Sequence, residues 1–147
     1  MTLDELRARV APWRYWVQAS ASPRGPQAAV VGVAVGEGLE LVFDTLGATR
    51  KAQNLRADPR IALVGWEGEQ TLQVEGLADE PAGDERTRIL ALYLGAFPDG
   101  RERVAWPGIT WVRVRPTWLR WSDYEGRPPE IFTWAREGER LVQVETG

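Results

Sequence analysis

Hydrophobic and polar positions alternate with a period of two along most of the chain, the pattern that half-buried β-strands produce. The alternation is clearest at 70–78, where Leu72 and Val74 alternate with Thr71 and Gln73. Short stretches rich in Gly, Pro and Ser separate such segments and indicate turns. The pattern predicts strands at 13–19, 27–35, 39–44, 60–67, 70–78, 110–114, 117–123, 131–134 and 141–145.

Three segments carry helix signals instead. Thr2 and Glu5 have the spacing of a capping box, and Pro12 ends the helix that they begin. Thr49 is a good N-cap for a second helix, which Asp58-Pro59 stops. A third helix is expected over 84–94, with Asp84 as its cap.

Many short antiparallel strands with a few short flanking helices predict a mainly β (α+β) fold, a small closed antiparallel barrel. A chain of 147 residues is expected to form one domain over 1–147. The segment 27–35 lacks alternation, so we expect both of its faces to be covered. Gly32 in its middle suggests the close approach of a backbone or a ligand, and Pro116 is expected to separate two strands.

Composition narrows the possible functions. The net charge of −3, from 21 acidic and 18 basic residues, argues against general nucleic-acid binding. The sequence has no 18-residue apolar run and no visible signal peptide, so we expect no membrane span and a cytoplasmic protein. With no Cys and no His, thiolate catalysis, Ser–His triads and the usual metal sites are excluded, and no metal is expected. Redox chemistry in such a chain would need a cofactor.

The charges of the second helix run against its dipole. Arg50 and Lys51 fall in the first turn, where carboxylates are favoured, and Lys51 is the one Lys among 18 basic residues. An anion bound at this helix start would resolve the conflict, held by free backbone N–H groups, the two cations and the hydroxyls of Thr45 and Thr49. The alternative is a solvated helix start whose cations point into water.

Two motifs resemble a known family. The run Arg-Lys-Ala-x-x-Leu-x-x-Asp-Pro at 50–59, followed by Val-Glu-Gly-Leu-Ala-Asp-Glu at 74–80, is similar to the pyridoxamine 5′-phosphate oxidase-like family of FMN-binding split β-barrels. The segment 27–80 carries the resemblance, and 109–124 extends it more loosely. The resemblance implies a split barrel, FMN as cofactor, and two chains that pair with the cofactor at their interface.

The resemblance also implies site residues. Arg50 and Lys51 match the pair that holds the FMN phosphate, and Thr49 stands where a small hydroxyl residue is usual. Asp44 and Thr45 match the strand end that contacts the cofactor, and Thr71 matches a polar position near the ring. The remaining implied contacts are the backbone of Val30, Val31, Gly32 and Val33 along the ring edge, and Trp121 or Trp118 from the partner chain against the ring, with interface packing as the alternative.

Other features bear on the substrate. Ala29 stands where true pyridoxamine 5′-phosphate oxidases have Arg, and their C-terminal Arg and Trp signature is missing from 131–147, so vitamin B6 oxidase activity is not expected. Arg113, Arg115 and Arg120 are expected on a solvated or salt-bridged face, or alternatively against an anionic substrate or acids of the partner. Eight Trp exceed what a chain of this size easily buries, so we expect some at a subunit interface.

The sequence therefore predicts an FMN-binding flavoprotein, an oxidoreductase whose substrate is unknown. The alternatives are a deazaflavin (F420)- or haem-binding member of the same fold, and a flavin-binding sensor or carrier without turnover. The last alternative stays open because no His or Cys lies near the motif and no catalytic residue is identified.

Overall fold

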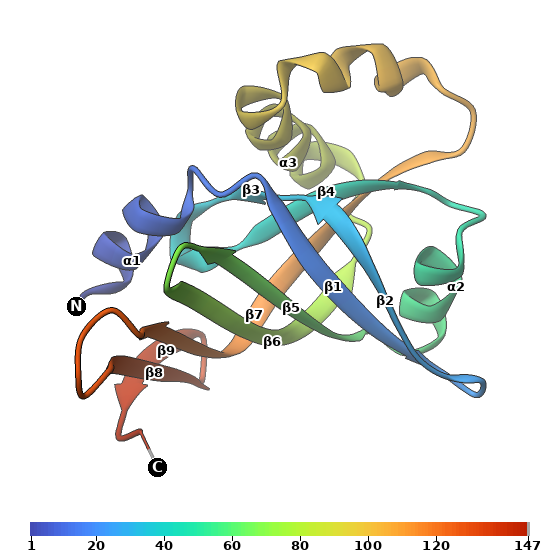
Figure 1. Cartoon of the computed structure of the whole chain (residues 1–147). Helices are drawn as coiled ribbons and strands as arrows, with labels where there is room; N and C mark the ends of the chain where they lie inside the picture. Colours follow the sequence, from blue (N-terminus) through green and yellow to red (C-terminus); the bar gives the residue numbers. More distant parts are fainter. Residues whose placement is uncertain (147) are drawn as a thin grey trace.

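A computed structural model describes residues 1–146, and nine antiparallel strands in one sheet dominate it (Figure 1). Helices lie at the ends and on one side of this sheet. No helix among these residues is both long and apolar enough to cross a membrane. The elements are α1 (Leu3–Val10), β1 (Tyr15–Ser22), β2 (Gly25–Gly32), β3 (Ala34–Val35), the 3₁₀-helix η1 (Glu37–Leu39), β4 (Leu41–Leu46), α2 (Arg50–Ala57), β5 (Arg60–Glu67), β6 (Gln70–Asp79), α3 (Gly83–Ala96), the 3₁₀-helix η2 (Pro98–Ala105), β7 (Ile109–Asp123), β8 (Glu130–Glu137) and β9 (Arg140–Val144).

The strands follow the order β2-β1-β5-β6-β7-β4-β3, and the β8–β9 hairpin branches off β7. The sheet curls until β2 passes beside β4, but these two strands share no ladder, so the barrel stays split. This confirms the mainly β fold and the split barrel that the resemblance implies. The closed barrel that the pattern predicts is wrong, because the sheet stays open between β2 and β4.

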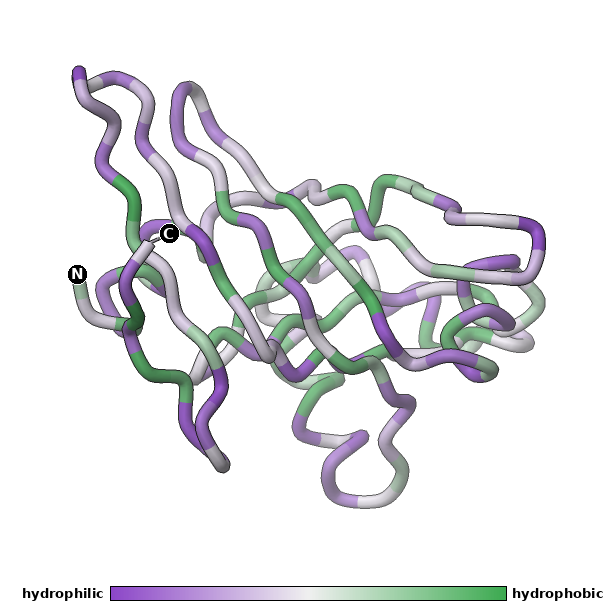
Figure 2. Tube along the Cα trace, turned by 90° about the horizontal axis from the view of Figure 1, so that it is seen from below, coloured by the Kyte–Doolittle hydropathy of each residue, from purple (hydrophilic) through white to green (hydrophobic). Residues whose placement is uncertain are grey.

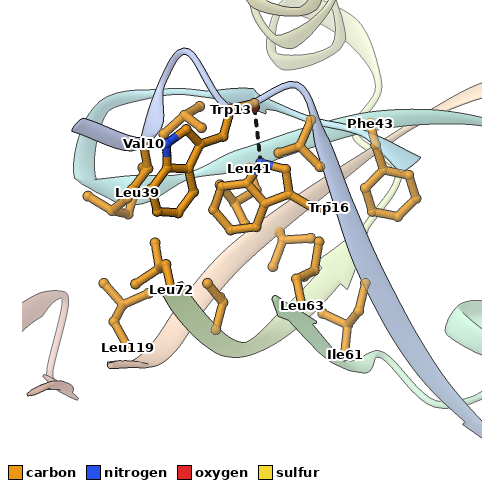
Figure 3. Packing of buried hydrophobic residues seen from close by; sticks show 14 of the residues in the cluster. Val10, Trp13, Trp16, Leu39, Leu41, Phe43, Ile61, Leu63, Leu72 and Leu119 are labelled. Carbon is orange, nitrogen blue, oxygen red and sulfur yellow. Dashed lines mark hydrogen bonds between the residues drawn. The ribbon is translucent and has the colours of Figure 1, made fainter. Parts of the chain in front are cut away.

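The concave side of the sheet holds the main core. Its strands point alternate apolar residues inward, and α1 closes one end with Leu6 and Val10. Figure 3 shows Trp16 at the centre, its indole N–H donating to the carbonyl oxygen of Trp13 at 3.1 Å. Full burial of a large apolar side chain of this kind contributes about 1.5–3 kcal/mol.

A smaller core lies on the other side of β4 and β7, under α3. Ile89 and Tyr93 of the helix pack on Val42 and Trp111, all of them buried. Both faces of β4 are therefore covered, although its sequence alternates. Arg113 lies on the same covered side, 4% exposed.

Local signals placed several elements correctly. The capping box of α1 is present, with Glu5 N–H donating to the Thr2 hydroxyl at 3.1 Å and Thr2 N–H donating to the Glu5 carboxylate at 2.8 Å. The strands at 60–67 and 70–78 form the expected hairpin, β5–β6. Thr49 is the N-cap of α2.

Two expectations were wrong in the first half of the chain. The gap at 20–26 between the strands expected at 13–19 and 27–35 is a tight turn, because β1 runs on to Ser22 and β2 begins at Gly25. The outward side of β2 is not covered in this chain, since Val30 is 63% exposed. Within the chain, Gly32 is approached by the ring of Phe97, which would lie 3.0 Å from an added Cβ.

The second half brings two further corrections. Pro116 does not end a strand: β7 runs from Ile109 to Asp123 and passes Pro116 at a bulge, where its pairing with β6 shifts. The missing N–H of proline therefore falls at an irregular position. Asp84 is not the cap of α3, because the helix starts one residue earlier with Ala82 as its N-cap.

Candidate functional site

The N-terminus of α2 follows a tight turn out of β4. The Thr49 N–H and hydroxyl both donate to the carbonyl oxygen of Leu46, at 3.0 and 2.8 Å. The same hydroxyl accepts the N–H of Ala52 at 3.4 Å, which makes Thr49 the cap. The helix accordingly begins at Arg50, directly beyond the strand end.

Arg50 and Lys51 occupy the first turn of α2, which contains no acidic residue. Neither side chain forms an ion pair with a carboxylate, nor do their backbone N–H groups find an acceptor, within residues 1–146. Two cations and two free amides thus meet at the positive end of a helix dipole. This arrangement favours an anion at that place.

The hydroxyls of Thr45 and Thr49 lie 2.9 Å apart. Because Thr49 already donates to Leu46, the Thr45 hydroxyl must donate to Thr49. Both hydroxyl protons are therefore used inside the turn. We conclude that the two threonines shape the turn, and that Arg50 and Lys51 offer the free donors.

Two polar side chains, Arg56 and Asn54, fix α2 against its surroundings. Arg56 binds the Glu80 carboxylate with two hydrogen bonds, at 2.8 and 2.9 Å, and also donates to the Gly47 carbonyl at 2.7 Å. The hydrogen bond from Arg56 lowers the pKa of Glu80. On the other side the Asn54 amide donates to Ser20 at 3.2 Å and to Gln27 at 3.1 Å, which ties the helix to the β1–β2 hairpin.

Asp44 lies apart from the α2 turn. Successive residues of a strand point to opposite faces, so Asp44 faces α3 while Thr45 faces the barrel. Its carboxylate forms an ion pair with Arg103 at 2.7 Å, and Arg103 donates to the Tyr93 hydroxyl at 3.0 Å. Burial, together with the charge of Asp44, raises the pKa of Tyr93 to about 12. In this structure Asp44 therefore holds η2 against β4.

The segment 30–33 presents an open backbone edge. The N–H of Val33 donates to the Arg14 carbonyl at 2.9 Å, on the β1 side. Hydrogen-bonded pairs alternate along an antiparallel ladder, so Val31 turns its N–H and C=O towards β1, while Val30 and Gly32 turn theirs to the open edge. The side chains of Val31 and Val33 are buried in the core.

Thr71 and Trp121 have different surroundings. Thr71 is half-buried on the convex face of the sheet, opposite Trp66 and Ser122. Trp121 points inward and is 1% exposed, stacked on Phe132 with 6.0 Å between ring centroids. The prediction that Trp121 flanks a ring held by a partner is corrected: its side chain belongs to the core of its own chain.

The structure thus brings Thr45, Thr49, Arg50 and Lys51 together, and leaves Asp44 and Trp121 elsewhere. Arg113 forms ion pairs with Asp79 at 2.5 Å and Glu85 at 2.7 Å, as the salt-bridged alternative for that face predicted. In the described part of the chain, no three acidic side chains cluster in a way that could hold a metal ion.

Sequence reasoning missed Gln18. Its side chain is fully buried, and neither amide atom has a hydrogen-bond partner within residues 1–146. The available signal was its position: Gln18 alternates with Trp16 and Ser20, which places all three on the inward face of β1.

The family model described as pyridoxamine 5′-phosphate oxidase matches residues 2–121. No curated protein matches the chain at a significant level.

Solved structures share the fold. A haem-binding protein from Mycobacterium smegmatis superposes with a TM-score of 0.73 at 22% identity, over 86% of this chain and 55% of that one. A pyridoxamine 5′-phosphate oxidase-related, FMN-binding protein from Nostoc punctiforme gives 0.69 at 13% identity, over 98% and 93% of the two chains. General Stress Protein 26 from Bacillus anthracis gives 0.67 at 17% identity, over 89% and 98%. The chain spans only about half of the Mycobacterium smegmatis protein.

Proposed function

The chain belongs to the pyridoxamine 5′-phosphate oxidase family, and from this premise we propose that it binds FMN and catalyses the oxidation or reduction of a small molecule. The observation that carries the proposal is the pair Arg50 and Lys51, which share the first turn of α2 with no carboxylate to pair with in residues 1–146. Such a site suits a phosphate dianion.

The residues present fit FMN at both of its ends. Arg50 and Lys51 would bind the phosphate with charge-assisted hydrogen bonds. The open-edge backbone groups of Val30 and Gly32 offer donors and acceptors to the N–H and C=O groups of a flavin ring. FMN, when bound, supplies the hydride-transfer chemistry, and the chain supplies anchoring, orientation and a pocket.

We place this cofactor between two copies of the chain. The support is the uncovered convex face next to the open edge of β2, where Val30 is 63% exposed. A second copy would cover this face and exclude water from the ring.

Replacing the two cations tests the phosphate site. Lys51→Ala and Arg50→Ala should each weaken FMN binding by about 10- to 150-fold, because each removes a charge-assisted hydrogen bond of about 1.5–3 kcal/mol. Arg101→Ala, an exposed cation on η2, is the matched control and should leave the affinity unchanged. Titration of flavin fluorescence measures each affinity. Unchanged affinity in the Arg50→Ala/Lys51→Ala double variant would refute the phosphate assignment.

Composition bears on the haem alternative. Haem iron is usually held by His or Cys, and the sequence has neither. The visible spectrum of the purified protein separates the three candidates, because FMN, a deazaflavin and haem absorb at different wavelengths. Turnover of the reduced cofactor with an added acceptor separates an enzyme from a carrier.

The arginines of β7 bear on vitamin B6 chemistry. Pyridoxine 5′-phosphate would need a second set of cations, but Arg113 is buried in ion pairs with Asp79 and Glu85. We therefore expect FMN-loaded protein to form no pyridoxal 5′-phosphate. Steady, saturable formation of that product would contradict this expectation.

A further inference from the structure

Arg120 and Ser122 carry polar atoms that find no partner in the described chain. They lie two residues apart on β7 after the bulge, on the side opposite to Leu119 and Trp121, which point into the core. Both side chains therefore belong to the convex face of the sheet. Figure 2, which views the molecule from below, shows hydrophilic and hydrophobic residues alternating along strands of this sheet.

Ser122 is fully buried, although it lies on the convex face. Its hydroxyl has no hydrogen-bond partner within residues 1–146, and neither has the Nε of Arg120, which is also buried. Buried polar atoms are nearly always hydrogen-bonded, and an orphaned one costs free energy. A guanidinium only donates hydrogen bonds, so Arg120 lacks an acceptor, and a serine hydroxyl can donate to the same acceptor group. A small anion would therefore satisfy both side chains.

The positive charge of Arg120 is not compensated either. Among residues 1–146 it forms no ion pair, whereas Arg60 and Arg113 are paired with aspartates. Glu75, a diagonal neighbour on the same face of β6, is exposed and is not paired with it. The guanidinium lies against the ring of Trp118, 5.3 Å from its centroid. A cation is thus available to a ligand at this place.

Arg120 can turn towards a ligand at little cost. Within residues 1–146 its guanidinium donates no hydrogen bond, so a change of rotamer breaks none. An incoming anion would first meet the two terminal nitrogens, which are not buried as Nε is. The change of rotamer is necessary, because Nε and the Ser122 hydroxyl are closed to solvent in this structure.

The register of the sheet places an aromatic side chain beside this pair. Trp66 on β5, Thr71 on β6 and Ser122 on β7 lie opposite one another in one row. Neighbouring strands are about 4.8 Å apart, so the backbones of Trp66 and Ser122 are about 10 Å apart, with Thr71 between them. The half-exposed indole of Trp66 offers a surface to an aromatic group. A molecule with a carboxylate at one end and a ring at the other would span this row.

We infer that Arg120 and Ser122 bind the carboxylate of a small aromatic carboxylic acid, whose ring lies over Thr71 against Trp66. A carboxylate suits this pair better than a phosphate dianion, because it matches the single charge of Arg120. The inference rests on the proposed function where it names the acid as the substrate, since the resemblance implies that Thr71 lies near the flavin ring. It supplies the class of substrate that the proposed function left open.

Calorimetric titration with sodium benzoate tests the site in the full chain, both free of FMN and loaded with it. Benzoate should bind both forms, and benzamide, which has a similar shape without the charge, should bind about 10-fold more weakly or worse. Arg120→Met and Ser122→Ala should each weaken benzoate binding by about 10- to 150-fold, because each removes a hydrogen bond to a charged group. Glu75→Gln, which removes a charge from the same face, is the matched control and should not weaken it.

A conservative variant separates recognition of the anion from packing. Arg120→Lys keeps the positive charge but loses the planar guanidinium that lies against Trp118, so it should retain part of the affinity for benzoate. Circular dichroism reports whether each variant is folded. If Arg120→Met does not fold, Arg120→Lys and Ser122→Ala still decide the question.

Four results would overturn the inference: no benzoate binding in either form, equal binding of benzamide, equal affinity of the folded Arg120 and Ser122 variants, or inorganic phosphate binding that depends on Arg120 in the same way. A fall in the FMN affinity of Arg120→Met without any benzoate binding would assign the pair to the cofactor.

The FMN titration of Arg50→Ala/Lys51→Ala tests the proposed function separately. If that titration refutes the phosphate site while benzoate still binds through Arg120, the carboxylate site stands and its role as a substrate site is refuted.

Discussion

Gly65 shows how one residue without a side chain permits the central packing of the barrel. A Cβ at this position would lie 2.6 Å from the indole of Trp16, which is fully buried and cannot move away without disturbing its neighbours. Trp16 in turn holds the Trp13 carbonyl, where the chain leaves α1 for β1. Gly at position 65 is therefore required for the Trp16 indole to occupy the centre of the core.

We predict that Gly65→Ala destabilises the fold by about 1–3 kcal/mol, the usual cost of overpacking a core. Gly95→Ala is the matched control: it lies in α3 with open space around it, and should be neutral or stabilising by up to about 1 kcal/mol. Urea denaturation of both variants measures the difference. Equal effects of the two substitutions would show that the contact with Trp16 does not limit this position.

Residues differ in how much of their role a sequence discloses. Thr2, Glu5 and Thr49 act on neighbours within four positions, so their capping roles could be predicted. Asp44 could not be assigned, because its partner Arg103 lies 59 residues away in a 3₁₀-helix. Trp121 could not be assigned either, because its burial depends on a bulge and on Phe132 in another strand.

At the scale of elements, α2 depends on the strands beside it. The helix is only eight residues long, too short to be stable alone, and Arg56 fastens its last turn to Glu80 and to the turn at Gly47. The first turn of α2, where we propose that the FMN phosphate binds, is thus held in place by contacts at the opposite end of the helix.

We predict that this fastening weakens in acid. The pKa of Glu80 is lower in the folded chain than its usual value of 4.5, so its stabilisation is complete above about pH 4.5 and is lost as the pH falls through the folded pKa. Because Arg56 is half exposed, the effect should be no more than about 1 kcal/mol.

Unfolding of wild type and Glu80→Gln as a function of pH provides the measurement. The difference in free energy of unfolding between the two proteins should shrink as the pH drops below about 4.5. A difference that stays constant down to low pH would mean that the carboxylate charge does not stabilise this helix.

The elements also show where sequence patterns are sufficient. Hairpin β5–β6 follows from strict alternation around Gly68-Glu69, all of it local. The burial of β4 on both faces could not be predicted from its own alternation, because it depends on α3, which packs on it from a distant part of the chain. For 27–35 the prediction was wrong in the opposite sense: both faces were expected to be covered, but the outward apolar side is exposed in the single chain.

At the scale of the whole molecule, the tryptophans are divided between core and surface. Trp13, Trp16, Trp111, Trp121 and Trp134 are buried, Trp118 is partly buried, and Trp66 and Trp106 are about half exposed. Trp66 lies on the convex face of the sheet, and Trp106 follows η2 on the other side of the sheet. If two copies pair on the convex face as proposed, only one of these two indoles changes its surroundings.

If two copies pair as proposed, we predict that a soluble fluorescence quencher reaches Trp106 but not Trp66, because the partner would cover Trp66. Trp106→Phe should therefore remove most of the quenchable emission. Quenching that Trp106→Phe leaves unchanged would contradict the prediction.

The bulge in β7 changes the phase of a strand. Before the bulge, Val112 and Val114 face the core, and after it Leu119 and Trp121 do. Leu119 lies five positions after Val114, whereas residues on one face of a regular strand are separated by an even number of positions. Thr117, which has no opposite residue on β6, is the extra step that resets the count. Gly76 across the ladder leaves space for this, since a Cβ there would lie 2.6 Å from the Arg115 carbonyl oxygen.

The number of residues between Val114 and Leu119 thus determines which side chains face the core after the bulge. Thr117→Val keeps the number of residues and should leave a folded protein, whereas deletion of Thr117 would turn Leu119 and Trp121 to solvent and Arg120 into the core. The shortened chain should not fold, as judged by circular dichroism. The single extra residue at the bulge, Thr117, therefore determines which side chains of the second half of β7 face solvent and which face the core.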